Sequence, residues 1–252
     1  MKANKLLALL RDNARNEALP AVRSEISSDT EAHVYVYDVI DAWWGASAQA
    51  LIEALAAAGD RTVHLHINSP GGDVTEARAM TAAIVAHTGK VISHIDGLAA
   101  SAATYLALAA NEVRMTEGAL FMVHNSWTLA MGDKTDLRST AELLDKIDGQ
   151  IAADYARRTG APLDQVVAWM NDETWFTPEE ALAAKFIDAV DPNSKRDGVQ
   201  DAADPARWNL SAYAKAPKLE RKSPEPDAAA IAAEAAAQAL RNRNRLRLVT
   251  QV

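Results

Sequence analysis

Apolar residues recur along the middle of the chain in two alternating patterns, one with a period of two residues and one with a helical period. Val63, Leu65 and Ile67 alternate with two histidines, as in a strand with one polar face. Apolar positions within Ser47–Ala58 recur at helical spacing instead. Because such strands and helices keep alternating, residues 31–192 predict an α/β fold with a mostly parallel sheet.

The same patterns predict further elements in this middle region. Strands are expected at residues 34–40, 91–95, 113–115 and 120–123. Helices are expected at residues 74–87, 100–109, 136–159 and 163–170. One more helix has a strong start signal, with Thr177 as N-cap, Pro178 at the first position and a glutamate, Glu180, at the third.

The two ends of the chain differ in composition from the middle. Residues 1–30 are polar and irregular after a short helical start, and we expect them to form an N-terminal arm. Residues 193–252 begin as a proline-containing linker, continue as an alanine-rich stretch that favours helix, and end in alternate arginines. We expect a helical or disordered C-terminal extension here. Its basic end suits either a solvated terminus or a docking segment.

Composition and charge narrow the classes of function. Hydrophobic residues make up 49% of the chain and charged residues 24%, as in an ordinary soluble globular protein. The net charge of -8 opposes nucleic acid as the main partner, because phosphate binding requires a basic field. The absence of cysteine excludes disulfides, zinc–thiolate sites and cysteine nucleophiles. No apolar run approaches the ~20 residues that span a bilayer, so we expect a cytoplasmic protein without a membrane partner.

Two turns rich in small residues follow strands and carry candidate chemistry. Asn68–Asp73 reads Asn-Ser-Pro-Gly-Gly-Asp, and its glycines allow backbone N–H groups to face a ligand. Asp96–Ala103 places Ser101 at the start of a helix of small residues, where the N–H of Ala102 can donate to an oxyanion. Each turn also has a plain structural explanation, a strand-to-helix connection for the first and a serine N-cap for the second.

A histidine closes the buried strand at 120–123. His124 precedes polar residues, a position in which active-site bases are often found. A core histidine bonded to the backbone explains the same pattern. We expect the other histidines to be structural or surface residues: His33, His64, His66, His87 and His94.

Taken together and in this order, these segments resemble the ClpP family of serine peptidases. The resemblance covers about residues 32–191. It rests on the family's Ser-Pro-Gly-Gly loop, nucleophile turn, histidine strand end and closing pattern, found here at Ile67–Val74, Gly97–Ala103, Met122–Asn125, Thr174–Ala181 and Phe186–Asp188. It implies a ClpP/crotonase-like spiral of ββα units, a ring-shaped homo-oligomer, and catalysis without a metal or other cofactor.

The resemblance also implies roles for individual residues. Ser101 is the expected nucleophile and His124 the expected general base. The backbone N–H groups of Gly72 and Ala102 are expected to form the oxyanion hole, where loss of one donor typically costs ~10²–10³ in rate.

The third member of the triad departs from the family pattern. The family's acid is an aspartate ahead of the aromatic residue of the closing pattern, and an ungapped match puts Glu173 there. A shift of one residue selects Asp172 instead. Glutamate can orient a histidine in other hydrolases, so Glu173 is the expected acid and Asp172 the alternative. Either residue also suits a solvated acidic turn.

Three features resemble the phage-encoded branch of this family, whose members are head maturation proteases. They are the Asp41–Gly45 turn, the Glu173–Trp175 segment and the long C-terminal extension. This branch implies a serine endopeptidase that processes capsid or scaffold proteins in the host cytoplasm.

Three other functions remain open. The chain could be the proteolytic subunit of an ATP-dependent Clp-type protease; because it has no phosphate-binding loop of its own, the ATPase would be a separate chain. A crotonase-type acyl-CoA enzyme shares the fold and the backbone oxyanion donors, but not the Ser–His pair. An inactive scaffold protein is the third.

Overall fold

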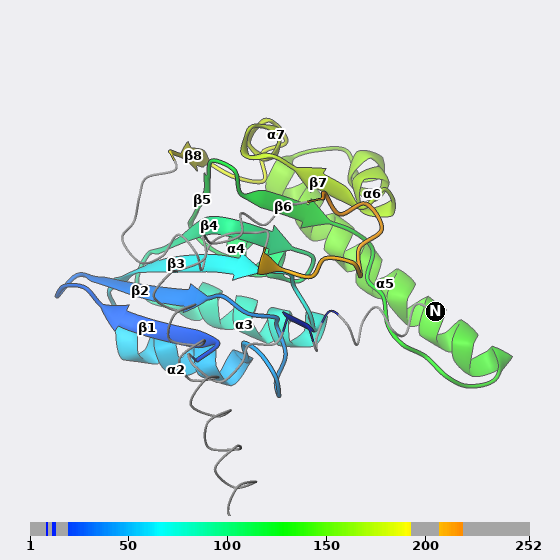
Figure 1. Cartoon of the computed structure of the whole chain (residues 1–252), viewed down its shortest axis with the longest axis horizontal. Helices are drawn as coiled ribbons and strands as arrows, with labels where there is room; N and C mark the ends of the chain where they lie inside the picture. Colours follow the sequence, from blue (N-terminus) through cyan, green and yellow to red (C-terminus); the bar gives the residue numbers. More distant parts are fainter. Residues whose placement is uncertain (1–8, 10–11, 14–19, 193–206, 219–252) are drawn as a thin grey trace, which may run out of the picture. The chain divides into compact units, whose positions relative to one another are not determined.

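The computed structural model describes residues 9, 12–13, 20–192 and 207–218, and a mostly parallel β-sheet lies at its centre (Figure 1). The main path of the sheet runs in the order β1 (Val22–Ile26), β2 (Glu31–Val36), β3 (Thr62–Ser69), β4 (Val91–Ala100), β5 (Glu112–Thr116) and β8 (Ala189–Asp191). Every neighbouring pair on this path is parallel except β1 with β2. The mixed α/β architecture with a mostly parallel sheet is therefore confirmed.

Two short strands leave this path and set up the region around Ser101. β6 (Leu120–Val123) pairs in parallel with the end of β4, and β7 (Thr174–Phe176) pairs antiparallel with β6. β4 pairs first with β5, up to Ile95, and then with β6. Because β4 continues beyond the strand that the hydrophobic pattern predicts, its last residue lies beside the end of β6.

Six helices connect or cover these strands. They are α2 (Ala48–Ala58), α3 (Val74–Ala86), α4 (Ala103–Leu108), α5 (Lys134–Thr159), α6 (Leu163–Asn171) and α7 (Pro178–Ala183) within the described residues. α2 and α4 pack against the sheet, and α3 packs between them. Side chains such as Leu51, Met80 and Leu106 are fully buried in the core that these helices share with β2, β3 and β4. Burial of this apolar area is the main stabilising contribution to the fold.

The helix starts follow the capping residues closely. Thr177 caps α7, its hydroxyl accepts the N–H of Glu180, and the Glu180 carboxylate accepts the N–H of Thr177. Pro178 is the first helical residue, as predicted. Ser47 and Asp73 cap α2 and α3 through side-chain oxygens that accept backbone N–H groups of the first turn. The strands β1, β7 and β8 were not predicted, because β1 has mostly exposed residues and the other two are only three residues long.

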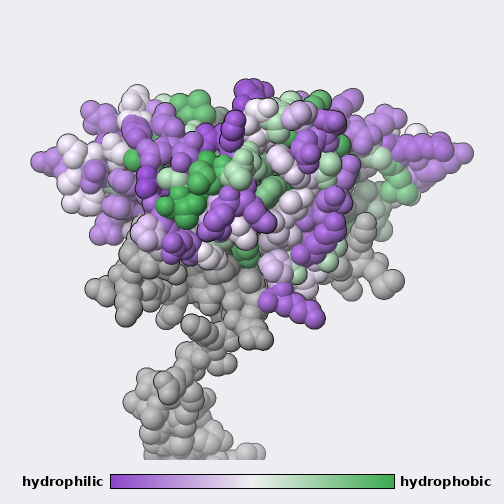
Figure 2. Space-filling view, turned by 90° about the horizontal axis from the view of Figure 1, so that it is seen from above, coloured by the Kyte–Doolittle hydropathy of each residue, from purple (hydrophilic) through white to green (hydrophobic). Residues whose placement is uncertain are grey.

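The predicted apolar stripe of α5 is buried along only part of the helix. Ile151 and Tyr155 are buried, whereas Leu137 and Leu143 are 46% and 57% exposed. Figure 1 shows the first half of α5 projecting away from the sheet. The space-filling view in Figure 2 shows a mainly hydrophilic face with a few apolar patches. An apolar stripe on a helix that projects from the body is available for contact with another surface.

The polar face of the sheet carries a connected network of histidines. Nδ1 of His33 lies 3.0 Å from Nε2 of His66, and Nδ1 of His64 lies 2.9 Å from Nε2 of His94. The buried Asp96 carboxylate lies 2.7 Å from Nδ1 of His66. The sequence pattern showed no companion for His33 or His94. Parallel pairing of β2, β3 and β4 supplies the companions, because it aligns alternate residues of three strands.

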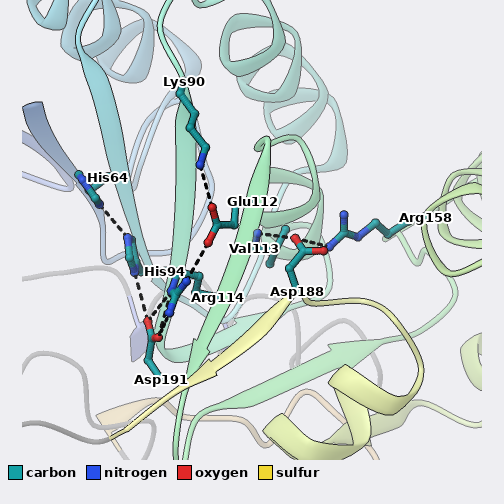
Figure 3. Close-up of polar contacts among 9 residues, drawn as sticks. All are labelled: His64, Lys90, His94, Glu112, Val113, Arg114, Arg158, Asp188 and Asp191. Carbon is teal, nitrogen blue, oxygen red and sulfur yellow. Dashed lines mark hydrogen bonds and ion pairs between the residues drawn. The ribbon is translucent and has the colours of Figure 1, made fainter. Parts of the chain in front are cut away.

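This network continues to the edge of the sheet through charged residues. Figure 3 shows His94 pointing toward the Asp191 carboxylate, which the Arg114 guanidinium binds through two nitrogens. Arg114 also binds Glu112, which in turn binds Lys90. These pairs connect β4, β5 and β8, so the polar face supports the register of the parallel strands.

Parts of both chain ends join the domain. β1 lies within the segment predicted as an N-terminal arm, and residues 207–218 of the predicted C-terminal extension pack against the residues around Ser101. The alanine-rich stretch and the arginines after it lie outside the described residues. Across the part of the chain that the structure describes, no helix is both long enough and apolar enough to cross a membrane.

Candidate active site

Ser101 occupies a sharp turn between β4 and α4. Its φ angle is 54°, in the left-handed region that non-glycine residues rarely adopt. The Ser101 N–H donates to the carbonyl of Met122, and its carbonyl accepts from both the N–H and the hydroxyl of Thr104. These bonds hold the strained backbone in place. The N-cap of α4 is Ala102, so Ser101 does not act as the helix cap.

The Ser101 hydroxyl faces His124. Oγ of Ser101 lies 2.7 Å from Nε2 of His124, which is hydrogen-bond distance. The pair forms because Ala100 at the end of β4 is aligned with Met122 of β6, one and two residues before the two side chains. Residues that are 23 positions apart in sequence are thus brought together by parallel strand pairing. The structure brings together the serine and histidine that the sequence motifs singled out.

The surroundings of His124 favour its neutral form. Burial of most of the ring lowers the pKa of His124 to about 4, and the negative charges of Glu173 and Asp148 oppose this shift. At neutral pH the imidazole is therefore uncharged and able to accept a proton. The sequence carried no signal for Asp148, which comes from α5 and accepts the N–H of Ser126.

The two candidate acids have different environments. The Asp172 carboxylate is 74% exposed and lies 3.3 Å from the ammonium group of Lys215. Glu173 adopts a φ angle of 49°, and its charge acts on His124. Within the described residues the Glu173 carboxylate accepts hydrogen bonds from the backbone N–H groups of Ala214 and Lys215 and from the Trp175 indole, at 2.8, 2.6 and 3.3 Å, and not from His124.

The glycine loop lies directly against the serine turn. A Cβ on Gly71 would lie 2.5 Å from the carbonyl oxygen of Ala100 and 2.9 Å from Cβ of Ser101, so only glycine fits there. Gly72 has a φ of 150°, and a Cβ on it would lie 2.1 Å from the carbonyl oxygen of Ile40. The sequence motif pointed to Gly72 but not to Gly71, because two adjacent glycines in a sequence do not reveal which one approaches the serine.

A segment of the C-terminal extension completes the surroundings of Ser101. Tyr213 is buried, its ring centroid lies 5.3 Å from that of His124, and its hydroxyl donates to the carbonyl of Pro70 in the glycine loop. Trp208 is also buried and donates its indole N–H to the Asn68 side chain at 2.9 Å. The sequence provided no signal for either residue, since both lie beyond the segment that resembles the ClpP family.

No metal site accompanies this arrangement in the part of the chain that the structure describes, where histidine, aspartate and glutamate side chains form no group of three that could hold an ion. The chemistry available from the described side chains is that of a hydroxyl beside a neutral imidazole. Such a pair supports nucleophilic attack by serine on an acyl group.

Comparison with known proteins agrees with the geometry. The family model described as Clp protease matches residues 23–194. The chain is 29% identical over 145 residues to the ATP-dependent Clp protease proteolytic subunit 1 of Leifsonia xyli, covering 57% of this chain and 74% of that protein. It is 29% identical over 150 residues to the proteolytic subunit 3 of Streptomyces avermitilis, covering 59% of this chain and 68% of that protein. Because the family model matches more than half of the residues, including the serine turn and the histidine strand end, this chain belongs to the Clp protease family.

Proposed function

We propose that this chain is a serine endopeptidase with Ser101 as nucleophile and His124 as general base. The single observation that carries the proposal is the 2.7 Å contact between Oγ of Ser101 and Nε2 of His124. As Oγ attacks the scissile carbonyl carbon, its proton moves to Nε2. The imidazolium then protonates the leaving amine as the C–N bond breaks, which leaves an acyl-enzyme. Water, deprotonated by the same imidazole, hydrolyses that ester and restores the serine.

Glu173 is the triad acid of this proposal, and Asp172 is the alternative. Glu173 is favoured because its charge acts on His124, whereas Asp172 is largely exposed and lies beside the ammonium group of Lys215. A triad acid orients the imidazole through Nδ1 and stabilises the imidazolium. In this proposal Glu173 reaches His124 only after its bonds to Ala214 and Lys215 have broken.

The oxyanion hole of this proposal consists of the backbone N–H groups of Gly72 and Ala102. It is supported by the close approach of the glycine loop to the serine turn, where an added side chain on Gly71 would collide with the Ala100 carbonyl. Two N–H donors aimed at the developing oxyanion stabilise the tetrahedral intermediate more than the ground-state carbonyl.

For the biological role we propose head maturation, with capsid or scaffold proteins as substrates of a ring-shaped homo-oligomer in the host cytoplasm. The exposed leucines on the projecting half of α5 provide a surface for contact between subunits. The ClpP/crotonase-like spiral of ββα units is part of the same proposal. The alternative is a proteolytic subunit served by a separate ATP-driven unfoldase, and the similarity to proteolytic subunits of ATP-dependent Clp proteases favours it. A crotonase-type enzyme and an inactive scaffold protein remain the other candidates.

The test of the peptidase proposal is labelling of the full chain with a fluorophosphonate probe, which bonds covalently to an activated serine. We expect one label per chain, located on Ser101 by mass spectrometry of the peptide fragments. Ser101→Ala should abolish labelling and His124→Ala should slow it by at least ~10³. A label on another serine, or equal labelling of both variants and the wild type, would refute the assignment.

A further inference from the structure

The segment Arg207–Lys218, here called the C-terminal strap, is anchored beside the serine–histidine pair at several points. Trp208, Leu210 and Tyr213 are 6%, 7% and 5% exposed, although the segment belongs to the predicted C-terminal extension. The Trp208 indole N–H donates to the side chain of Asn68, which lies in β3 just before the glycine loop. Burial of three large apolar side chains indicates that the strap is bound as a ligand and does not merely pass over the surface.

Further anchors hold the strap near its first residues. The side-chain amide of Asn13 donates to the carbonyl of Asn209 at 2.9 Å, and the N–H of Asn209 donates to the Asn13 side chain at 2.6 Å. The Asn209 side chain also donates to Asp12. The strap thus has reciprocal hydrogen bonds at one end and the active-site contacts at the other.

Tyr213 lies beside the serine–histidine pair. Its hydroxyl donates to the carbonyl of Pro70 at 2.5 Å, in the glycine loop that lies against the Ser101 turn. Its ring packs nearly perpendicular to His124 and to Trp175, with centroid distances of 5.3 and 5.8 Å. An attacked carbonyl carbon must lie ~3–3.5 Å from the serine oxygen. The phenol occupies space that a peptide substrate would need.

The next two residues of the strap engage the candidate acid. The backbone N–H groups of Ala214 and Lys215 donate to the two carboxylate oxygens of Glu173 at 2.8 and 2.6 Å. The Lys215 ammonium group lies 3.3 Å from the alternative acid, Asp172. Through three consecutive residues the strap therefore packs against the proposed base, binds the glycine loop beside the nucleophile and binds the proposed acid.

From these contacts we propose that the C-terminal strap is an autoinhibitory ligand of the chain's own active site and must leave before a substrate can bind. The inference rests on the proposed peptidase function. Tyr213 presents a phenol beside His124 and the glycine loop, and a phenol offers no carbonyl to attack, so the bound strap acts as an inhibitor and not as a substrate. Release of the strap opens the space beside Ser101, uncovers His124 and frees the Glu173 carboxylate to bond the imidazole.

The experiment compares fluorophosphonate labelling rates of the full chain with and without the key contact. Tyr213→Ala should label at least about tenfold faster than the wild type, because it removes the ring and the hydroxyl that cover Ser101. Tyr213→Phe removes only the hydroxyl, so its labelling rate should lie between those of the wild type and Tyr213→Ala. Ser211→Ala is the matched control, because Ser211 is an exposed residue of the same strap. In this variant Ser101 should be labelled at the wild-type rate. Equal, Ser101-dependent rates in the wild type and Tyr213→Ala would overturn the inference and leave the peptidase proposal standing.

A second measurement tests the strap proposal independently of the peptidase proposal. In the Ser101→Ala background, hydrogen exchange at the Ala214 and Lys215 amides should be slow, and addition of Tyr213→Ala should accelerate it by about tenfold or more. Fast exchange at both amides in Ser101→Ala alone would overturn the proposal that the strap is bound. Absence of labelling in every variant together with protected amides would refute the peptidase proposal while supporting the strap as a bound segment.

Discussion

The N–H of Lys215 donates to the Glu173 carboxylate at 2.6 Å, a bond between the proposed triad acid and a residue outside the segment that matches the Clp protease family. It links two parts of the chain that are 42 positions apart. A carboxylate that accepts two backbone N–H groups has fewer lone pairs free for an imidazole. The state of the triad is therefore coupled to the position of the C-terminal strap.

The identity of the triad acid can be tested once the strap is displaced. In the Tyr213→Ala background we expect Glu173→Gln to lower kcat for peptide hydrolysis by ~10²–10⁴, because an amide holds the imidazole poorly and cannot stabilise its cation. Asp172→Asn is the matched neighbour and should change kcat less than about threefold, since exposed charges interact weakly. If Asp172→Asn caused the large loss and Glu173→Gln did not, the one-residue shift would be correct.

The pH dependence of labelling should show whether the Tyr213 ring shields His124 from water. Burial lowers the pKa of His124 to about 4, and the Tyr213 ring is part of the surface that excludes water from it. Removal of that ring in Tyr213→Ala should raise the midpoint of the acidic limb toward the ordinary histidine value of ~6.5. Labelling rates measured from pH 4 to 8 for both proteins give the two midpoints. Identical midpoints would show that Tyr213 does not shield the imidazole.

Stability should depend on His124 over the same pH range. Because the folded-state pKa lies below the unfolded value, the unfolded chain takes up a proton first as the pH falls, and the free energy of unfolding decreases between about pH 6.5 and 4. The loss attributable to this residue is at most about 3 kcal/mol, and partial exposure of the ring reduces it. Urea denaturation at pH 7 and pH 4.5 should show a smaller difference for His124→Gln than for the wild type.

The glycine loop should not tolerate a side chain at Gly72. Gly72→Ala combines a positive φ with a Cβ that would lie 2.1 Å from the Ile40 carbonyl oxygen, so we expect destabilisation by roughly 1–3 kcal/mol and loss of labelling. Gly149→Ala is the control, because Gly149 lies within α5 and a Cβ there meets nothing within 4 Å. It should stabilise by ~0.5–1 kcal/mol, since alanine favours helix. Thermal melting of both variants would distinguish these effects.

The buried carboxylate of the histidine network should be structurally important but remote from catalysis. Asp96 contacts both Nδ1 of His66 and the Tyr37 hydroxyl, so Asp96→Ala leaves two buried polar groups without this acceptor. We expect destabilisation by about 3 kcal/mol in chemical denaturation. Labelling of the folded fraction on Ser101 should stay within about twofold of wild type. If the labelling rate of folded Asp96→Ala fell as far as that of His124→Ala, Asp96 would belong to the active site instead.

Local patterns in the sequence predict most of the helices and strands and the order of the motifs. Period-two alternation at Val63–Ile67 and the cap at Thr177 and Glu180 depend on neighbouring residues, so they are visible without a fold. Ser101 and His124 could be chosen in advance because each stands in a motif that resembles a known family. Their separation of 2.7 Å was decided by the pairing of β4 with β6, which no local pattern encodes.

The residues that surround this pair depend on how distant segments pack together. Tyr213 and Trp208 lie far along the chain beyond the family motifs, and neither hydrophobic period nor motif marks them as ligands of the site. The alignment of His33, His64, His66 and His94 likewise arises from parallel register across three strands. Contacts between segments distant in sequence depend on how the chain packs as a whole, so a local pattern predicts the elements while packing decides which side chains meet.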